Sequence, residues 1–253
     1  MARQTFLPIR ELTGQPYSNI LGFPKANKKQ LQSRIKELQK LKINSVCFEG
    51  ASLIGKLHVL GKGYVGIVVL AKQNQKKVAV KIRRTDSQRD GMVNEARLLE
   101  LANKAKAGPK VIKSSKNFLV MEYLDGEKIF DWIKQLKGKG ASKKLKKTVK
   151  KVLEDCYRLD QLGLDHGELS NISKHVIVGK KATLIDFESS STNRRVSNVT
   201  AACQAIFIGS GISKMVKKIY KIPPKSQMIK ALRAYKNEQT RQSFDDVLKI
   251  LRL

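Results

Sequence analysis

A glycine loop between two apolar runs is the feature that most constrains the fold. Residues 61–66 read Gly-Lys-Gly-Tyr-Val-Gly, the spacing G-x-G-x-x-G, and the aliphatic run 67–71 follows directly. In a dinucleotide-binding βαβ unit the last glycine of this spacing opens a helix, whereas the β-branched residues after Gly66 favour a strand. The sequence therefore predicts strand, glycine loop, strand. Backbone N–H groups in such a loop can close over phosphates.

A lysine at the end of the next apolar run fits the same chemistry. Val78-Ala79-Val80-Lys81 predicts a strand that carries Lys81 beside the loop, where its ammonium could hold phosphates. A lysine in this place needs a carboxylate partner, and a helix predicted over 87–106 supplies one. Glu95 is the first candidate for that partner and Glu100 the second.

A further strand is predicted at 118–123, before the turn Leu124-Asp125-Gly126. Its end, Met121-Glu122-Tyr123, fits a connector between two lobes. The backbone groups of Glu122 and Tyr123 could contact an adenine ring there.

Two later motifs each carry a carboxylate. They are His166-Gly167-Glu168-Leu169 and Ile185-Asp186-Phe187-Glu188, and a strand hairpin turning at Gly179 is predicted between them. This layout would bring Glu168 near a substrate hydroxyl and Asp186 onto a Mg²⁺ ion that bridges phosphates. His166 is expected to brace the loop.

The order of these elements predicts an α+β protein with two lobes, because a strand-rich half precedes a helix-rich half. We expect three parts: residues 1–52, an N-terminal extension with a basic amphipathic helix over 28–42; 53–123, a small lobe with an antiparallel sheet; and 124–253, a reduced helical lobe. Residues 1–26 contain several prolines and glycines and are expected to be irregular or loosely docked.

The chain is strongly basic. It has 51 Lys and Arg against 21 Asp and Glu, a formal net charge of +30. Segment 134–151 holds nine lysines, ten basic residues lie between 194 and 236, and neither stretch contains an acid. Such clustering favours a polyanion partner, although charge runs are also common on solvated helix faces. Aromatic residues make up only 6%, so structured RNA is a better candidate than stacked single strands.

Cys47, Cys156 and Cys203 lie far apart and form no Cys-x-x-Cys pair, which predicts reduced thiols in the cytoplasm. The first residues lack the apolar stretch of a secretory signal, and no run is long and apolar enough to span a membrane.

Taken together, residues 54–190 resemble the protein-kinase-like superfamily. Within it they are similar to the atypical branch of RIO kinases, the kinase-like subunit of the tRNA threonylcarbamoyl-adenosine complex and predicted archaeal serine/threonine kinases. The helix sequence Glu95-Ala96-Arg97-Leu98-Leu99 favours Glu95 over Glu100, and His166-Gly167-Glu168-Leu169-Ser170 resembles the H-G-D-L-S/T of the branch.

The resemblance implies a bilobal kinase-like fold that binds ATP and Mg²⁺ and phosphorylates a protein substrate or itself. Its implied catalytic residues are Lys81, Glu168 and Asp186. Its implied nucleotide-binding residues are Gly61, Gly63, Gly66, Lys81, Glu95, Glu122 and Tyr123. Self-phosphorylation is expected within Ser189-Ser190-Ser191-Thr192.

Three departures weaken the expectation of fast phosphoryl transfer. Glu168 stands where the branch has aspartate, Ser173 where a metal-binding asparagine is usual, and Glu188 where D-F-G has glycine. Asn171 or His175 could take the place of that asparagine. The candidate metal ligands are Asp186, Asn171 and Ser173. A slow kinase, an ATPase and a pseudokinase that acts as a nucleotide-gated RNA-binding module all stay open. A small-molecule kinase is disfavoured, because the acid-free stretches do not suit a cationic substrate.

Overall fold

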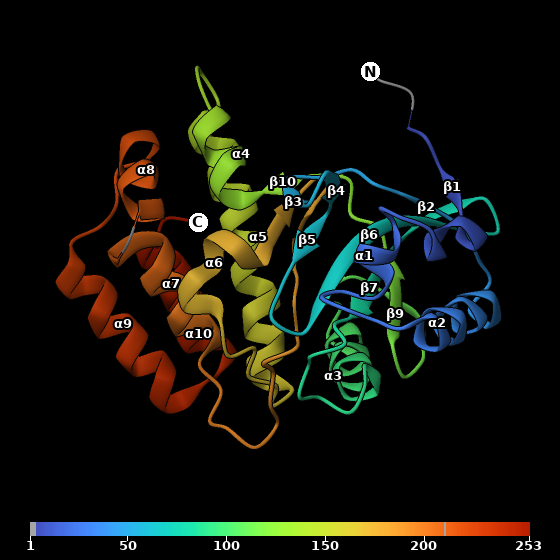
Figure 1. The fold of residues 1–253 in the computed structure, drawn as a ribbon. Helices are drawn as coiled ribbons and strands as arrows, with labels where there is room; N and C mark the ends of the chain where they lie inside the picture. Colours follow the sequence, from blue (N-terminus) through green and yellow to red (C-terminus); the bar gives the residue numbers. More distant parts are fainter. Residues whose placement is uncertain (1–3, 210) are drawn as a thin grey trace. The chain divides into compact units, whose positions relative to one another are not determined.

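The computed structural model describes residues 4–209 and 211–253 and divides the chain into two compact units (Figure 1). One unit runs to Glu100 and includes Pro109–Leu124; the other comprises Leu101–Gly108 and Asp125–Leu253. The first unit is built on an antiparallel sheet and the second mainly on helices. This confirms the predicted α+β, bilobal kinase-like class.

The sheet of the first unit has seven strands in the order β1-β2-β6-β7-β9-β8, with β5 paired to β6. Its strands are β1 (Leu7–Pro8), β2 (Ile43–Cys47), β5 (Gly61–Lys62), β6 (Gly66–Gln73), β7 (Lys76–Arg83), β8 (Val111–Ser114) and β9 (Phe118–Glu122). The apolar residues before the glycine loop fold back as the hairpin β3 (Ser52–Ile54) and β4 (Leu57–Val59), since Gly55 turns the chain at φ +57°.

Side-chain alternation in β6 and β7 separates the core from the chemistry. Ile67, Val69 and Ala71 of β6 and Val78, Val80 and Ile82 of β7 belong to one buried hydrophobic cluster. Successive side chains of a strand point to opposite faces of the sheet. Lys81, which pairs with Val68 in the register, therefore lies on the face opposite this cluster.

Residues 1–26 were expected to be irregular or loosely docked, and this was wrong for residues 4–26, the part that the structure describes. Residues 4–26 include a 3₁₀ turn, η1 (Ile9–Thr13), and one helical turn, α1 (Ser18–Leu21). Ile9, Leu12, Ile20 and Leu21 are buried in the hydrophobic cluster of the sheet. Elements of one turn are too short to produce a periodic apolar pattern, so the sequence of this segment gives no local signal for its helical turns.

The predicted basic helix is present as α2 (Lys28–Lys40), which begins at a capping box between Asn27 and Gln30. Glu37 fixes the helix to the turn between β8 and β9, because its carboxylate accepts hydrogen bonds from Ser115 Oγ at 2.7 Å and Asn117 N at 3.1 Å. The predicted boundary after residue 52 thus falls inside one compact unit.

The helix expected over 87–106 begins later, as α3 (Val93–Lys104). The guanidinium of Arg83 donates to the carbonyl oxygens of Ser87 (3.3 Å) and Arg89 (2.8 Å). These carbonyl oxygens accept from the Arg83 side chain, whereas a carbonyl inside a helix accepts from the N–H group one turn later. The segment before Val93 is therefore an irregular turn.

The second unit combines a small sheet with a helical core. Its elements are β10 (Glu127–Lys128), α4 (Ile129–Gln135), α5 (Ala141–Gln161), η2 (Leu169–Asn171), α6 (Ile172–His175), β11 (Val176–Val178), β12 (Ala182–Leu184), α7 (Asn198–Cys203), the π-helical turn η3 (Gln204–Ile208), α8 (Gly211–Ile219), α9 (Lys225–Glu238) and α10 (Arg241–Ile250). Strands β11 and β12 form the predicted hairpin at Gly179, and β10 pairs with β11.

Over the described ranges, no single helix combines the length and the apolar character needed to cross a membrane. One bent pair of helices, Asn198–Ile208 with Gly211–Ile219, is long and apolar enough to span a membrane by length and composition alone. Several of its apolar side chains, including Val199, Ile206 and Val216, are buried.

A buried carboxylate joins three helices of the second unit. Asp160, at the end of α5, accepts hydrogen bonds from Asn198 N (3.0 Å), Asn198 Nδ2 (2.8 Å) and Val199 N (3.2 Å) at the start of α7, and from the Tyr235 hydroxyl of α9 (2.8 Å). Burial raises the pKa of Asp160, while these donors lower it. The donors lie away from water, so they depend on this one side chain.

Replacement of Asp160 by alanine should therefore lower the free energy of unfolding by about 3 kcal/mol or more, because several buried donors lose their acceptor. The exposed Asp246 on α10 gives a matched control, and Asp246→Ala should cost less than about 0.5 kcal/mol. Urea unfolding can be followed by the fluorescence of Trp132, the only tryptophan, which lies in the same unit. Equal losses in the two variants would contradict this role for Asp160.

Candidate functional site

The first unit contains a buried ion pair between two predicted site residues. Lys81 Nζ lies 2.7 Å from Glu95 Oε1, and each side chain is 5% exposed. Glu100, the second candidate, is exposed on the same helix. The structure thus brings Lys81 together with Glu95, the partner that the resemblance favoured.

The glycine loop lies directly against Lys81. Gly61 belongs to β5, Gly66 begins β6, and Gly63 N donates to Gly66 O at 2.8 Å, so the three glycines form one compact turn. A Cβ atom at Gly66 would come within 2.8 Å of Ile82 O and 3.0 Å of Lys81 Cγ. Glycine is favoured there because a Cβ atom would clash with the backbone carbonyl of Ile82 and would also press on the stem of Lys81.

The residues predicted to contact adenine lie at the end of β9. The backbone N–H of Glu122 donates to Lys110 O at 2.9 Å, and its carboxylate accepts from Lys110 N at 3.2 Å. The ring of Tyr123 lies 5.9 Å from Lys77 Nζ. The Glu122 N–H is thus used within the protein, and an adenine contact at these two residues stays a prediction.

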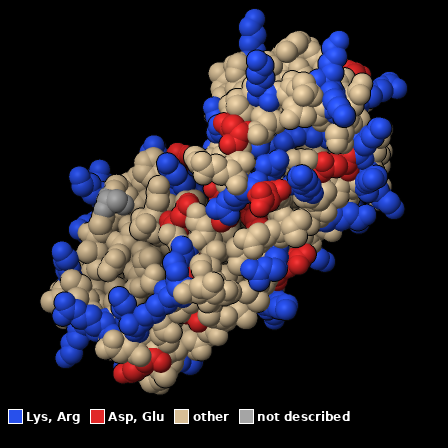
Figure 2. All heavy atoms as spheres, turned by 60° about the horizontal axis from the view of Figure 1, so that its bottom comes forward, with Lys and Arg blue, Asp and Glu red and all other residues tan. Residues whose placement is uncertain are grey.

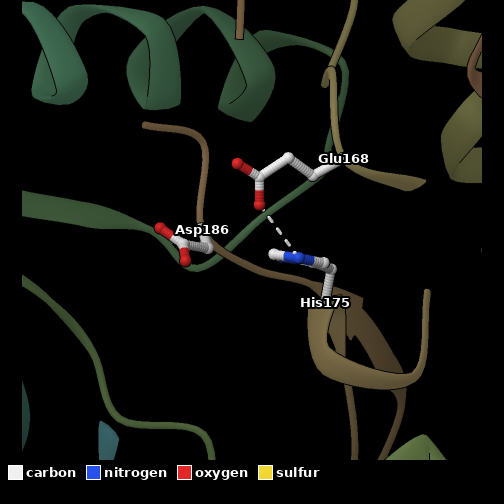
Figure 3. A group of neighbouring side chains, drawn as sticks. All are labelled: Glu168, His175 and Asp186. Carbon is white, nitrogen blue, oxygen red and sulfur yellow. Dashed lines mark ion pairs between the residues drawn. The ribbon is translucent and has the colours of Figure 1, made fainter. Parts of the chain in front are cut away.

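In the second unit, the two predicted carboxylates lie together with a histidine (Figure 3). Glu168 precedes η2, His175 ends α6, and Asp186 follows β12. One ligand atom of each lies within 4.8 Å of the others. The β11–β12 hairpin returns the chain to this place, as the spacing of the two motifs predicted.

His175 orients Glu168. Its Nε2 lies 3.0 Å from Glu168 Oε2, and the imidazole is buried. Burial lowers the pKa of His175, whereas Asp186 and Glu168 raise it. Its Nδ1 has no hydrogen-bond partner among the described residues, and a buried N–H without a partner is costly. In the neutral imidazole with its proton on Nε2, that N–H donates to Glu168 and Nδ1, which has no partner among the described residues, carries no proton.

His166 connects the two carboxylate loops. Its Nε2 lies 3.0 Å from Ile185 O, its backbone N–H donates to Asn198 Oδ1 at 2.8 Å, and its ring packs 4.8 Å from that of Phe187. Burial, and then the neighbouring His175, lower the pKa of His166 to about 4. A neutral, buried imidazole in this position braces the loops, as the sequence analysis expected.

The donor set suits a divalent cation. Carboxylate oxygens are the ligands that Mg²⁺ prefers, and both Asp186 and Glu168 supply them. Asp186 adopts a left-handed backbone conformation with φ +69°. Asn171 and Ser173 hydrogen-bond to each other, with Ser173 Oγ donating to Asn171 Oδ1 at 2.7 Å. The side chain grouped with both carboxylates is His175.

Sequence reasoning missed Lys128 near this group, and it named Ser189 as a self-phosphorylation candidate without predicting its contact with Glu168. Lys128, at the end of β10, donates to Lys174 O at 2.6 Å; burial lowers its pKa and the charge of Asp186 raises it. Ser189 Oγ donates to Glu168 Oε1 at 2.5 Å. Lys128 is brought there by the pairing of β10 with β11, a contact for which the sequence carries no local signal.

Loss of the Glu95 charge should destabilise the first unit. Glu95→Gln leaves the buried Lys81 ammonium without this carboxylate, and we expect the free energy of unfolding to fall by about 3 kcal/mol. Glu100→Gln makes the same chemical change on the exposed face of α3 and should cost less than about 0.5 kcal/mol. Urea unfolding of both variants measures the difference. Similar values for both would show that the Lys81–Glu95 pair is not specifically stabilising.

Comparisons with known proteins agree with this geometry. The family model of the RIO domain matches residues 71–196, a range that includes Lys81, Glu95, Glu168 and Asp186. Over 98 residues, 39% of this chain and 81% of the relative, the sequence is 29% identical to the uncharacterized protein MJ1211 of the archaeon Methanocaldococcus jannaschii. The RIO family lies within the atypical protein-kinase superfamily. The chain therefore contains a RIO domain of that superfamily at residues 71–196.

Proposed function

We propose that this protein is an ATP- and Mg²⁺-dependent atypical serine/threonine protein kinase of the cytoplasm that phosphorylates a protein substrate or itself. The RIO domain supports a kinase or ATPase at the level of the family. The finer assignment rests on the residues of the two units.

The observation that carries the proposal is the buried Lys81–Glu95 pair at the base of the glycine loop. Burial of two charges carries a desolvation cost that their attraction does not fully offset, so stability alone does not explain why Lys81 and Glu95 are buried beside Gly66. A lysine oriented by a glutamate is the arrangement that holds the α- and β-phosphates of ATP in kinases. In this proposal Gly61, Gly63 and Gly66 cover the phosphates and Lys81 grips them.

The second unit would supply the transfer chemistry. Asp186 would hold the metal ion, with Asn171 and Ser173 as further proposed ligands, and Glu168 would accept the proton of the acceptor hydroxyl. A bound Mg²⁺ neutralises the charge that develops on the phosphates. Glu168 is longer than aspartate by one methylene, and the hydrogen bond from His175 fixes its extra torsion.

Removal of the proposed metal ligand tests this function. Asp186→Ala should lower the rate of ATP turnover by at least about 100-fold, the scale on which loss of one charge-stabilising group acts. Asp131→Ala removes an exposed carboxylate from α4 and should leave the rate unchanged. Release of ADP and transfer of the γ-phosphate to a generic protein substrate are measured with MgATP. Equal turnover in wild type and Asp186→Ala would contradict the proposal.

The charge of the chain supports an RNA or ribonucleoprotein partner. Figure 2 shows a face on which Lys and Arg side chains are spread widely and exceed Asp and Glu. Lys143, Lys144, Lys147 and Lys150 are exposed on α5, whose opposite face is buried. Lys146 of α5 lies over the ring of Tyr220, 4.9 Å from its centroid. This contact connects α5 to the second basic segment, residues 194–236, which includes Tyr220. We propose that segments 134–151 and 194–236 contact the phosphates of structured RNA.

Such binding should weaken steeply with salt. Replacement of Lys143, Lys144, Lys146 and Lys147 by glutamine should reduce the slope of log affinity against log salt by up to about 0.9 for each lysine that contacts a phosphate. A control with the same charge change replaces Lys28, Lys29, Lys36 and Lys40 of α2, which are all exposed. Fluorescence anisotropy with labelled tRNA measures both slopes. A flat salt titration, or equal slopes in the two variants, would exclude this surface.

The alternative function is a catalytically weak pseudokinase that binds RNA under the control of a nucleotide. Glu188, which replaces the glycine of D-F-G and is buried, favours it because it limits the backbone after Asp186. ATP-dependent RNA binding without ADP release would support this alternative over the kinase.

A further inference from the structure

A serine of the chain itself lies at the proposed catalytic base. Ser189 Oγ donates to Glu168 Oε1 at 2.5 Å, a short contact typical of a hydroxyl bound to a carboxylate. A general base must lie within hydrogen-bond reach of the proton that it removes. Ser189 meets this geometric requirement without any rearrangement.

The carboxylate that faces Ser189 is fixed on its other side. Glu168 Oε2 accepts from His175 Nε2 at 3.0 Å, and His175 is buried at the end of α6. With one oxygen held by the imidazole, Oε1 is the atom left to receive a proton from Ser189. His175 acts here through Glu168, as a positioning residue.

The backbone of Ser189 is also held in place. Arg194 Nη2 donates to Ser189 O at 2.6 Å, and Arg194 Nε donates to Asp165 Oδ2 at 3.0 Å. Gly167 permits this arrangement, because a Cβ atom there would lie 2.5 Å from Arg194 Nη2 and 2.8 Å from Ser189 O. The half-exposed Arg194 guanidinium would also lie near a phosphate on Ser189 and balance its charge.

The neighbouring hydroxyls are engaged or oriented differently. Ser190 is buried and its Oγ donates to His166 O at 3.4 Å, while Ser191 Oγ accepts from Asn193 N at 3.1 Å. Thr192 is exposed. Of the four hydroxyls at 189–192, Ser189 is the one with a hydrogen bond to Glu168 among the contacts described.

We propose that Ser189 is the residue on which the protein phosphorylates itself, within one chain, with Glu168 as the base. This inference rests on the proposed kinase function. Ser189 Oγ forms a bond to the γ-phosphorus of ATP as the bond from that phosphorus to the bridging β–γ oxygen breaks. The hydroxyl proton passes to Glu168 Oε1, and ADP leaves with the bridging oxygen.

The test incubates the full chain with radiolabelled ATP and Mg²⁺, maps the phosphate by mass spectrometry and measures ADP release in parallel. We expect label on Ser189, at a rate per chain that does not change over a hundredfold range of protein concentration. Ser189→Ala should lose at least 90% of the label, whereas Thr192→Ala, a hydroxyl of the same segment, should keep it. Ser189→Thr restores a hydroxyl and should restore label at position 189.

The outcomes separate this inference from the function on which it rests. ADP release with label at other positions only, or with no label on the protein, overturns the assignment of Ser189 and leaves the ATP-consuming activity standing. A labelling rate that rises with protein concentration overturns transfer within one chain. Neither ADP release nor label overturns the proposed function and this inference together.

Discussion

The buried ammonium of Lys81 is the constraint on which the first unit depends. An unpaired charge in a protein interior costs several kcal/mol, so Lys81 requires a carboxylate at hydrogen-bond distance. Glu95 supplies it at 2.7 Å and so fixes the start of α3 beside β7. Gly66 lies against the same strand, since a Cβ atom there would clash with the carbonyl oxygen of Ile82 and would crowd the stem of Lys81. One ion pair thus links the sheet, the glycine loop and the helix.

In the second unit, two carboxylates likewise depend on hydrogen-bond partners. Asp160 gathers donors from α7 and α9 and makes the helical core specific, while Glu168 is held between His175 and Ser189. Asp160 is buried among its donors, whereas Glu168 keeps more than a third of its side chain exposed. The buried carboxylate therefore stabilises the fold, and the accessible one remains available for chemistry.

Patterns that are local in sequence predicted most of the fold. Strands β6, β7 and β9, the helix α2 and the hairpin at Gly179 all follow from runs of apolar residues with turn residues between them. The pairing of Lys81 with Glu95 could be predicted because a strand and the next helix supply both members. The prediction for residues 4–26 was wrong, since their buried side chains lie in elements of a single turn.

Contacts between distant segments could not be predicted in this way. The hydrogen bond from Ser189 to Glu168 and the four donors of Asp160 join residues that are many positions apart, and they depend on how helices and loops pack. His175 was considered only as a metal ligand, whereas the structure shows it bound to Glu168. Neither residue type nor spacing distinguishes these two roles.

The most direct test of the account is the binding of MgATP measured by isothermal titration calorimetry on wild type and Lys81→Met. We expect one site per chain in the wild type and a dissociation constant at least about tenfold higher in Lys81→Met, a loss of about 1.4 kcal/mol. Absence of binding to the wild type, or equal affinity in both proteins, would contradict the claim that the buried Lys81–Glu95 pair exists to hold a nucleotide.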